Sequence, residues 1–149
     1  MADFKVRAIE RADRAQWAPL WRAYLTFYHT AEKAEVTDAT FARIFDPLEP
    51  VHGLVAARDQ TLIGFSHYIF QRSTWLVAAR CYLQDLFVDP ANRGGGVGRA
   101  LIGAVAAAAK EAGAANVYWN THETNATARK LYDALAERTG FTQYRIDPL

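Results

Sequence analysis

Residues 82–101 read Tyr-Leu-Gln-Asp-Leu-Phe-Val-Asp-Pro-Ala-Asn-Arg-Gly-Gly-Gly-Val-Gly-Arg-Ala-Leu. The apolar start predicts a strand, the Asp-Pro pair a turn, and the glycines a loop that leads into the first turn of a helix. Such a junction leaves several backbone N–H groups without intrahelical acceptors, at the positive end of the helix dipole. The stretch therefore predicts an anion site, most naturally a phosphate site.

Composition narrows the class of protein further. A chain of 149 residues, 51% of them hydrophobic, predicts one compact domain over 1–149. A formal net charge of +1 disfavours a nucleic-acid partner, which would call for a clustered basic face. The single cysteine, Cys81, has no partner for an internal disulfide, and its apolar surroundings predict a buried thiol. No signal peptide or membrane-length apolar run is visible, so we expect a cytoplasmic protein with no membrane partner.

Periodicity along the rest of the chain predicts both strands and helices. The expected strands lie at 5–9, 53–57, 62–70, 82–88, 116–120 and 141–146, the second and third forming a hairpin. The expected helices begin near Asp13, at Thr37, after the glycine loop and at Asn125, and the last two end at Gly113 and Gly140. This order predicts a mixed α/β fold.

Two well-known phosphate loops do not match the glycine stretch. A P-loop needs Lys followed by Ser or Thr at the start of the helix, whereas Gly98 is followed by Arg99 and Ala100. A dinucleotide fingerprint needs glycine at the sixth position, which Arg99 occupies when counted from Gly94 and Leu101 when counted from Gly96. The glycine stretch is therefore expected to be an anion-binding loop of a third kind.

The pattern Arg93-x-x-Gly96-x-Gly98 after a strand resembles the acetyl-CoA loop of the GNAT superfamily of N-acetyltransferases. That family also has a later helix that begins with Asn and carries Tyr seven residues on, matched here by Asn125 and Tyr132. The strand sequence at 82–88 is similar to that of the diamine and Hpa-type acetyltransferases, and the segment 119–125 is similar to that of the Hpa-type branch.

The resemblance implies a fold and an activity. The implied fold is α/β (α+β), the GNAT fold, with a mixed, mainly antiparallel sheet of six to seven strands flanked by about four helices. The implied reaction transfers the acetyl group of acetyl-CoA, by direct attack, to a primary amine on a small molecule, an amino acid or a protein lysine. No metal is implied, and a homodimer is compatible with the family.

Site residues follow from the same resemblance. The backbone around Arg93, Gly94, Gly95, Gly96, Val97, Gly98 and Arg99 is implied to bind the pyrophosphate. Phe87 and Val88 are implied to offer backbone groups to the pantetheine, and Asn125 is implied to contact the cofactor as well as to cap its helix. Tyr132 is implied to be the general acid that protonates the departing thiolate, since a phenol with a pKa near 10 stays protonated at pH 7.

The sequence offers several candidates for the general base. Diamine acetyltransferases carry Glu-Asp where this chain has Gln84 and Asp85, and an amide cannot act as a base. Asp85 is the first candidate, His122 and Glu123 are weaker ones, and no base is needed if the amine arrives neutral. Strand alternation predicts that Gln84 and Asp85 face opposite sides of the sheet.

The histidines of the chain do not have the spacing of a metal site. His122-Glu123 lacks the second histidine of a zinc-protease helix, and His29, His52 and His67 have no ligand spacing, so no metal site is expected. The alternative to an enzyme is a non-catalytic acyl-CoA sensor or an interaction domain with the same fold.

Overall fold

The computed structural model describes residues 3–149, which form one compact unit up to Trp119 and a second from Asn120 to Leu149. Within those residues, no helix is long and apolar enough to cross a membrane.

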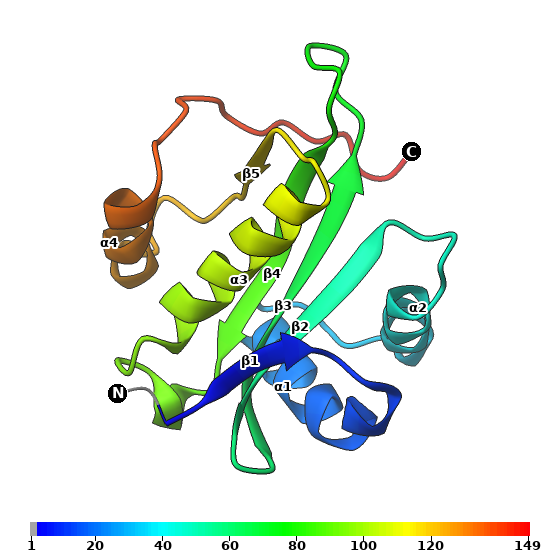
Figure 1. Cartoon of the computed structure of the whole chain (residues 1–149), viewed down its shortest axis with the longest axis vertical. Helices are drawn as coiled ribbons and strands as arrows, with labels where there is room; N and C mark the ends of the chain where they lie inside the picture. The colour runs from blue at the N-terminus through cyan, green and yellow to red at the C-terminus, as the bar shows by residue number, and fades with distance from the viewer. Residues whose placement is uncertain (1–2) are drawn as a thin grey trace. The chain divides into compact units, whose positions relative to one another are not determined.

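A sheet of five strands forms the centre of the first unit (Figure 1). Its strands lie in chain order, β1 (Lys5–Ala8), β2 (Val51–Arg58), β3 (Thr61–Gln71), β4 (Arg80–Val88) and β5 (Asn116–Tyr118). Neighbours from β1 to β4 are antiparallel, and β5 runs parallel to β4. The expected hairpin is confirmed, with Asp59 at a positive φ of 55° in its two-residue turn.

The expected count of six to seven strands is wrong for the described chain. Residues 136–149 contain no helix or strand, so the strand expected at 141–146 is absent. The side chains of Phe141, Tyr144 and Ile146 are exposed. An alternating apolar pattern indicates which side chains would share a face of a strand. A strand also needs a neighbouring strand that forms hydrogen bonds with its backbone, and the pattern does not show whether one is present.

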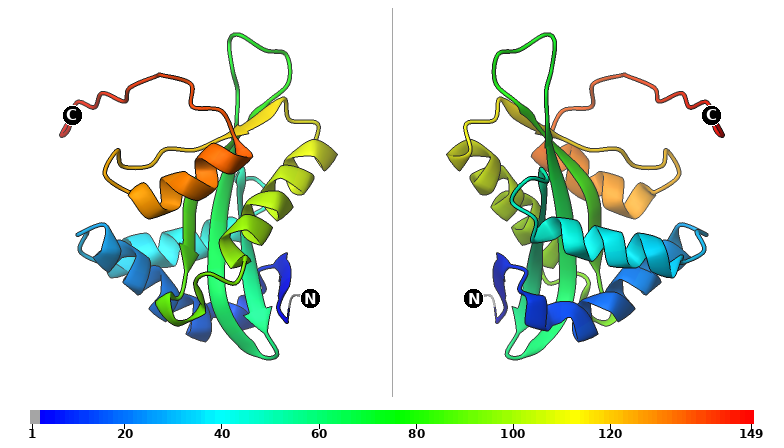
Figure 2. Two further views of the ribbon diagram at one scale, coloured as in Figure 1. Left: turned by 90° about the vertical axis from the view of Figure 1, so that its left-hand side faces the viewer. Right: turned by 90° about the vertical axis from the view of Figure 1, so that its right-hand side faces the viewer.

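Helices cover both faces of the sheet in the first unit (Figure 2). The helix α3 (Val97–Glu111) packs on one face, and α1 (Arg14–Phe27) and α2 (Ala34–Ile44) pack on the other. Two short 3-10 helices, η1 (Arg11–Asp13) and η2 (Pro90–Asn92), precede α1 and the glycine loop. The core between α1, α2 and the sheet consists of Ile9, Trp17, Trp21, Phe41, Val55, Ala57, Leu62, Phe65 and Phe87.

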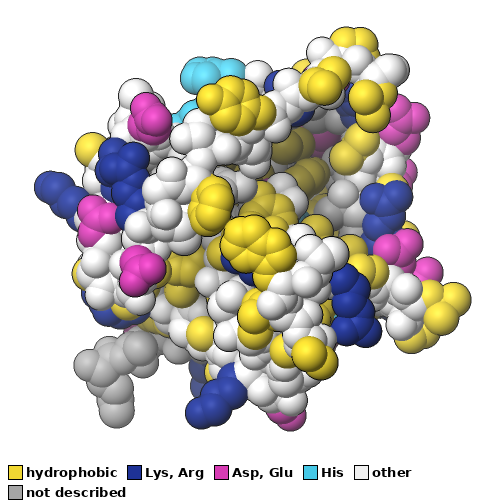
Figure 3. Space-filling view, turned by 90° about the horizontal axis from the view of Figure 1, so that it is seen from above, with side chains coloured by type: hydrophobic (Ala, Val, Ile, Leu, Met, Phe, Trp, Pro, Cys, Tyr) yellow, Lys and Arg dark blue, Asp and Glu magenta, His cyan; other side chains and the backbone are white. Residues whose placement is uncertain are grey.

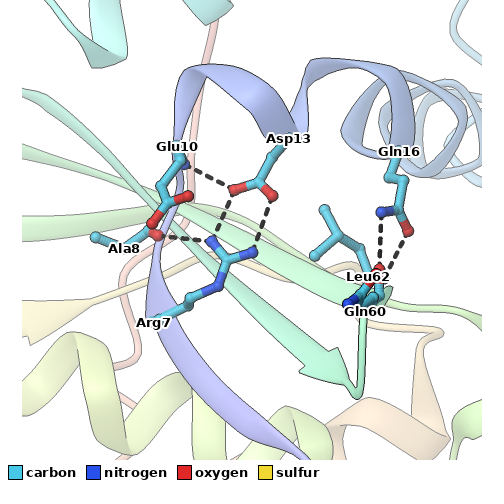
Figure 4. Close-up of polar contacts among 7 residues, drawn as sticks. All are labelled: Arg7, Ala8, Glu10, Asp13, Gln16, Gln60 and Leu62. Carbon is cyan, nitrogen blue, oxygen red and sulfur yellow. Dashed lines mark hydrogen bonds and ion pairs between the residues drawn. The ribbon is translucent and has the colours of Figure 1, made fainter.

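The start of α1 is stabilised by an ion pair (Figure 4). Asp13 precedes the helix as expected, but its side chain makes no capping bond to α1. Its carboxylate instead accepts two hydrogen bonds from Arg7, at 2.8 and 2.9 Å, and one from the backbone N–H of Glu10 at 2.7 Å. These contacts join β1 to α1, and the hydrogen bond to Arg7 holds the pKa of Asp13 below its usual value.

The start of α2 differs from the expected one. The helix begins at Ala34 after Lys33, so Thr37 lies within it and is not its cap. Thr37 is buried, and its hydroxyl accepts a hydrogen bond from the indole N–H of Trp21 at 3.1 Å. Packing against α1 therefore decides the role of this hydroxyl.

The second unit contains one helix, α4 (Ala126–Leu135). Asn125 caps it as expected, because its side chain accepts from the backbone N–H of Ala128 at 3.4 Å. The helix ends at Leu135, five residues before Gly140, which was expected to stop it. By contrast, Gly113 ends α3 as expected, with a left-handed φ of 79°.

The surface drawn in Figure 3 mixes acidic and basic side chains, with apolar ones exposed between them. This agrees with the near-neutral formal charge.

The variant Asp13→Asn tests the link between β1 and α1. We expect it to lower the free energy of unfolding by about 1–3 kcal/mol at pH 7, because it weakens the part-buried bonds to Arg7. Since the pKa of Asp13 is lowered by folding, its stabilising contribution is present above the unfolded pKa, about 3.9, and is lost as the pH falls through the folded value. Urea unfolding at pH 7 and pH 3 measures this difference.

Asp38→Asn is the matched control for this experiment. Asp38 pairs with Arg14 while 67% exposed, so its loss should change the free energy of unfolding by at most about 0.5 kcal/mol. Equal effects of the two variants would contradict the assignment.

Candidate active site

The glycine loop opens α3 with its backbone exposed. Gly94 and Gly96 take left-handed φ values of 83° and 85°, which favour glycine, and Gly96 is the N-cap of α3. No side chain caps the helix, and nothing lies within 4 Å of where a Cβ would stand at either glycine. The first amides of α3 have no intrahelical acceptor. The loop thus leaves open space in front of these donors, which suits a phosphate group.

Arg93 folds back from the loop onto the end of β4. Its Nε donates to the carbonyl oxygen of Val88 at 3.0 Å, and its guanidinium lies 5.5 Å from the ring centre of Phe87. The Arg93 side chain therefore links the glycine loop to the end of β4. Arg99, in the first turn of α3, is exposed.

The strand β4 has an open edge next to this loop. It pairs with β3 up to Val88, but β5 pairs with it only over residues 80–82. No other strand of the described chain lies along residues 83–88, so that edge offers backbone groups with no strand partner. Close approach of β3 requires Gly64, where a Cβ would stand 2.8 Å from the carbonyl oxygen of Phe87.

A bulge at Gln84 changes which face the residues of β4 occupy. Leu83 is opposite Tyr68 and Asp85 is opposite His67, so Gln84 has no partner on β3. Since cross-strand partners share a face, Leu83 and Asp85 lie on opposite faces although they are two residues apart. Strict alternation is therefore broken between Leu83 and Asp85, and Gln84 between them is exposed.

Asp85 lies on the face that α1 covers, in a group of polar side chains. Its Oδ2 lies 2.9 Å from Nδ1 of His67, whose Nε2 lies 3.1 Å from Nε1 of Trp17. The Tyr24 hydroxyl also interacts with the carboxylate. Asp85 is 8% exposed, His67 2% and Trp17 not at all, so these bonds are shielded from water.

The charge of this carboxylate affects the pKa values of Tyr24, in α1, and Tyr28, the residue that follows the helix. Burial raises the pKa of the Tyr24 hydroxyl, and the negative charge of Asp85 raises it further. The pKa of Tyr28 rises for the same two reasons, in the same order. Both phenols therefore stay protonated at neutral pH and serve as hydrogen-bond donors.

The remaining candidates lie in the second unit. Tyr132 is half-buried on α4, and Asn125 caps that helix. His122 and Glu123 precede it, in the segment before Asn125. The structure thus brings together the loop and the end of β4 within the first unit, and Tyr132 and Asn125 within the second.

Sequence reasoning missed the partners of Asp85. His67 has no ligand spacing in the sequence, and no local pattern links Trp17 or Tyr24 to Asp85. The signal that joins them is the register of β3 with β4, which depends on the bulge at Gln84.

Comparisons with known proteins agree with this geometry. The acetyltransferase (GNAT) family model matches residues 16–136. The D-amino-acid N-acetyltransferase HPA3 of Saccharomyces cerevisiae is 39% identical over 142 residues, covering 94% of this chain and 88% of that protein. Thialysine N-epsilon-acetyltransferase of Bos taurus is 35% identical over 74 residues, covering 50% of this chain and 43% of that protein.

A similar solved structure is that of the aminoglycoside N-acetyltransferase AAC(6')-Iy in complex with CoA. It superposes with a TM-score of 0.78 at 21% identity, covering 96% of this chain and 95% of that one. The chain therefore belongs to the GNAT acetyltransferase family and has its fold. It is an acetyl-CoA-dependent N-acetyltransferase.

Replacing Gly96 by alanine tests the loop. A Cβ at a left-handed φ costs about 1–2 kcal/mol, so the loop should shift and displace its amides. We expect Gly96→Ala to raise the Kd for acetyl-CoA about tenfold or more, measured by titration calorimetry. Gly103→Ala is the control, since Gly103 is an exposed residue within α3 with no positive φ and nothing within 4 Å of its Cβ position. An unchanged Kd for Gly96→Ala would contradict the assignment of the loop.

The thiol of Cys81 should be unreactive in the folded protein. Cys81 is fully buried, and burial raises the pKa of its thiol to about 11, which lowers the thiolate fraction at pH 8 about 100-fold relative to a free cysteine. We expect an aromatic disulfide reagent to label Cys81 at least about 100-fold faster in 6 M guanidinium, a concentration chosen to unfold typical domains. Equal labelling rates would show that the thiol is accessible.

Proposed function

We propose that the chain transfers the acetyl group of acetyl-CoA to a primary amine by direct attack on the thioester. The observation that carries this proposal is the exposed glycine loop at the start of α3, beside the open edge of β4. Bound acetyl-CoA supplies the acetyl group as an activated thioester. The match of the family model to residues 16–136 further supports one acetyltransferase domain over the whole chain.

The proposed cofactor contacts come from three places. Backbone amides of residues 93–99 bind the pyrophosphate, with Arg99 as the charged partner. The backbone groups of Phe87 and Val88 are the proposed contacts of the pantetheine, at the end of β4 where only β3 pairs with the strand. Asn125 adds a contact from the cap of α4.

The proposed acceptor is a cationic amine of a small molecule, an amino acid or a protein lysine. Two relatives support an amino-acid acceptor, because their names are those of a D-amino-acid and a thialysine acetyltransferase. Asp85 suits a cationic acceptor, since an ionised carboxylate attracts an ammonium group and can take its proton. Gln84 cannot perform that step because its side chain is an amide.

Tyr132 is proposed as the general acid that protonates the departing sulfur. We expect Tyr132→Phe to lower kcat by about 100-fold or more while leaving the Kd for acetyl-CoA within about twofold, because only the proton donor is removed. Tyr144→Phe is the control, since Tyr144 is 92% exposed. Unchanged turnover in Tyr132→Phe would remove this role.

An acceptor screen with detection of free CoA tests the proposed function directly. The panel should hold D- and L-amino acids, thialysine, polyamines, aminoglycosides and lysine peptides. Release of CoA that depends on an amine supports the enzyme. A non-catalytic sensor would instead be stabilised by CoA, by about 2.7 kcal/mol at 100 times its Kd, without releasing thiol. An interaction domain would show neither effect.

A further inference from the structure

Four side chains from three elements form a continuous polar chain beneath α1. Trp17 and Tyr24 come from α1, His67 from β3 and Asp85 from β4. The chain runs from the Trp17 indole to the His67 ring, on to the Asp85 carboxylate and to the Tyr24 hydroxyl. These contacts join residues 17 and 85, which are far apart in the sequence.

The direction of each hydrogen bond follows from the chemistry of the donors. An indole N–H can only donate, so the Nε2 of His67 that faces Trp17 must carry a lone pair. In a neutral imidazole the proton then lies on Nδ1, and that N–H donates to Oδ2 of Asp85. Trp17 thus selects the tautomer of His67, and His67 is a donor toward Asp85.

No Lys or Arg side chain pairs with the Asp85 carboxylate in the described part of the chain. The only ion-pair contact of Asp85 within residues 3–149 is with His67, which is neutral in this tautomer. Burying a carboxylate without a paired cation costs free energy, unless hydrogen-bond donors or a ligand offset its lost hydration. His67 and Tyr24 supply two donors, and a carboxylate accepts about four hydrogen bonds, so capacity remains for a further donor.

We propose that Trp17 and His67 are positioning residues that hold the Asp85 carboxylate in the orientation in which it receives the ammonium group of the acceptor. This inference rests on the proposed function, in which Asp85 faces the acceptor amine. The inference adds that the action of Asp85 depends on the His67 imidazole, which the Trp17 indole holds in one tautomer.

The protons and electrons of the step balance as follows. An N–H bond of the ammonium breaks, its proton moves to an oxygen of Asp85, and the nitrogen keeps the electron pair. That pair forms the bond to the acetyl carbon, the carbon–sulfur bond breaks, and the sulfur takes a proton from Tyr132. The nitrogen, now bonded to the acetyl carbon, loses its second proton, which replaces the one that Tyr132 gave to sulfur, and the product is the neutral amide. His67 gains no proton, because its Nδ1 already bears one and its Nε2 accepts from Trp17.

The decisive variants differ in whether they keep the donor to Asp85. His67→Phe removes it while retaining a ring among the neighbouring aromatics. His67→Asn keeps it, because the amide nitrogen of asparagine lies as far from Cβ as Nδ1 does. His52→Phe is the control, since His52 stacks on Tyr68, which the register of β2 with β3 places on the other face of the sheet from His67.

We expect His67→Phe to lower kcat/KM for the amine by about 10- to 100-fold, the effect of losing one hydrogen bond to a charged group. The KM for acetyl-CoA should stay within about twofold in all variants. His67→Asn should regain activity to within about fivefold of the parent, which a purely structural role would not explain. Equal losses in His67→Phe and His67→Asn, or no loss in either, would overturn the proposal.

Two further measurements separate the possible failures. Asp85→Asn with full activity would remove the proposed role of Asp85 and the inference with it. Loss in Asp85→Asn without loss in His67→Phe would overturn the inference alone. Nitrogen NMR of the unmodified protein, which needs no variant to fold, should find the His67 proton on Nδ1. A proton on Nε2 would contradict the assigned directions.

Discussion

Unequal pairing of the two edges of β4 is the constraint on which the candidate site depends. One edge is bonded to β3 as far as Val88, whereas the other has a strand neighbour only at its first three residues. Backbone groups within a sheet normally satisfy one another, so an unpaired stretch must find other partners. The glycine loop begins where that stretch ends, so a strand edge without a strand partner and loop amides without an intrahelical acceptor lie next to each other in one unit. A long ligand with phosphates at one end and amides along its length fits such a surface.

The local parts of this arrangement were predictable from the sequence. Glycine and proline have direct effects on backbone angles, so the turn, the loop at 93–98 and the start of α3 were predicted correctly. The cap at Asn125 was also local, because a side chain there reaches an amide three residues away. Family resemblance then supplied the class of enzyme, which the comparisons confirm.

Features that depend on distant partners were not predictable in the same way. Thr37 is a plausible cap in isolation, but its hydroxyl accepts from Trp21 once α1 and α2 pack. Residues 141–146 have the apolar pattern of a strand without a described neighbour to pair with. The contact between His67 and Asp85 depends on the register of β3 with β4, which no periodicity in a single segment reveals. In each case the missing information was which distant segment lies beside the residue in the fold.

The bulge at Gln84 also bears on how this strand tolerates evolutionary change. The two halves of β4 present their side chains in opposite phase, and the extra residue makes the switch. Deleting Gln84 would make Leu83 and Asp85 adjacent, and ordinary alternation would keep them on opposite faces, as their consecutive partners Tyr68 and His67 are. The bulge thus takes up one extra residue without changing the face on which Asp85 lies. A relative that lacks a residue at this position would keep its aspartate opposite the histidine, so a one-residue gap here is compatible with the site.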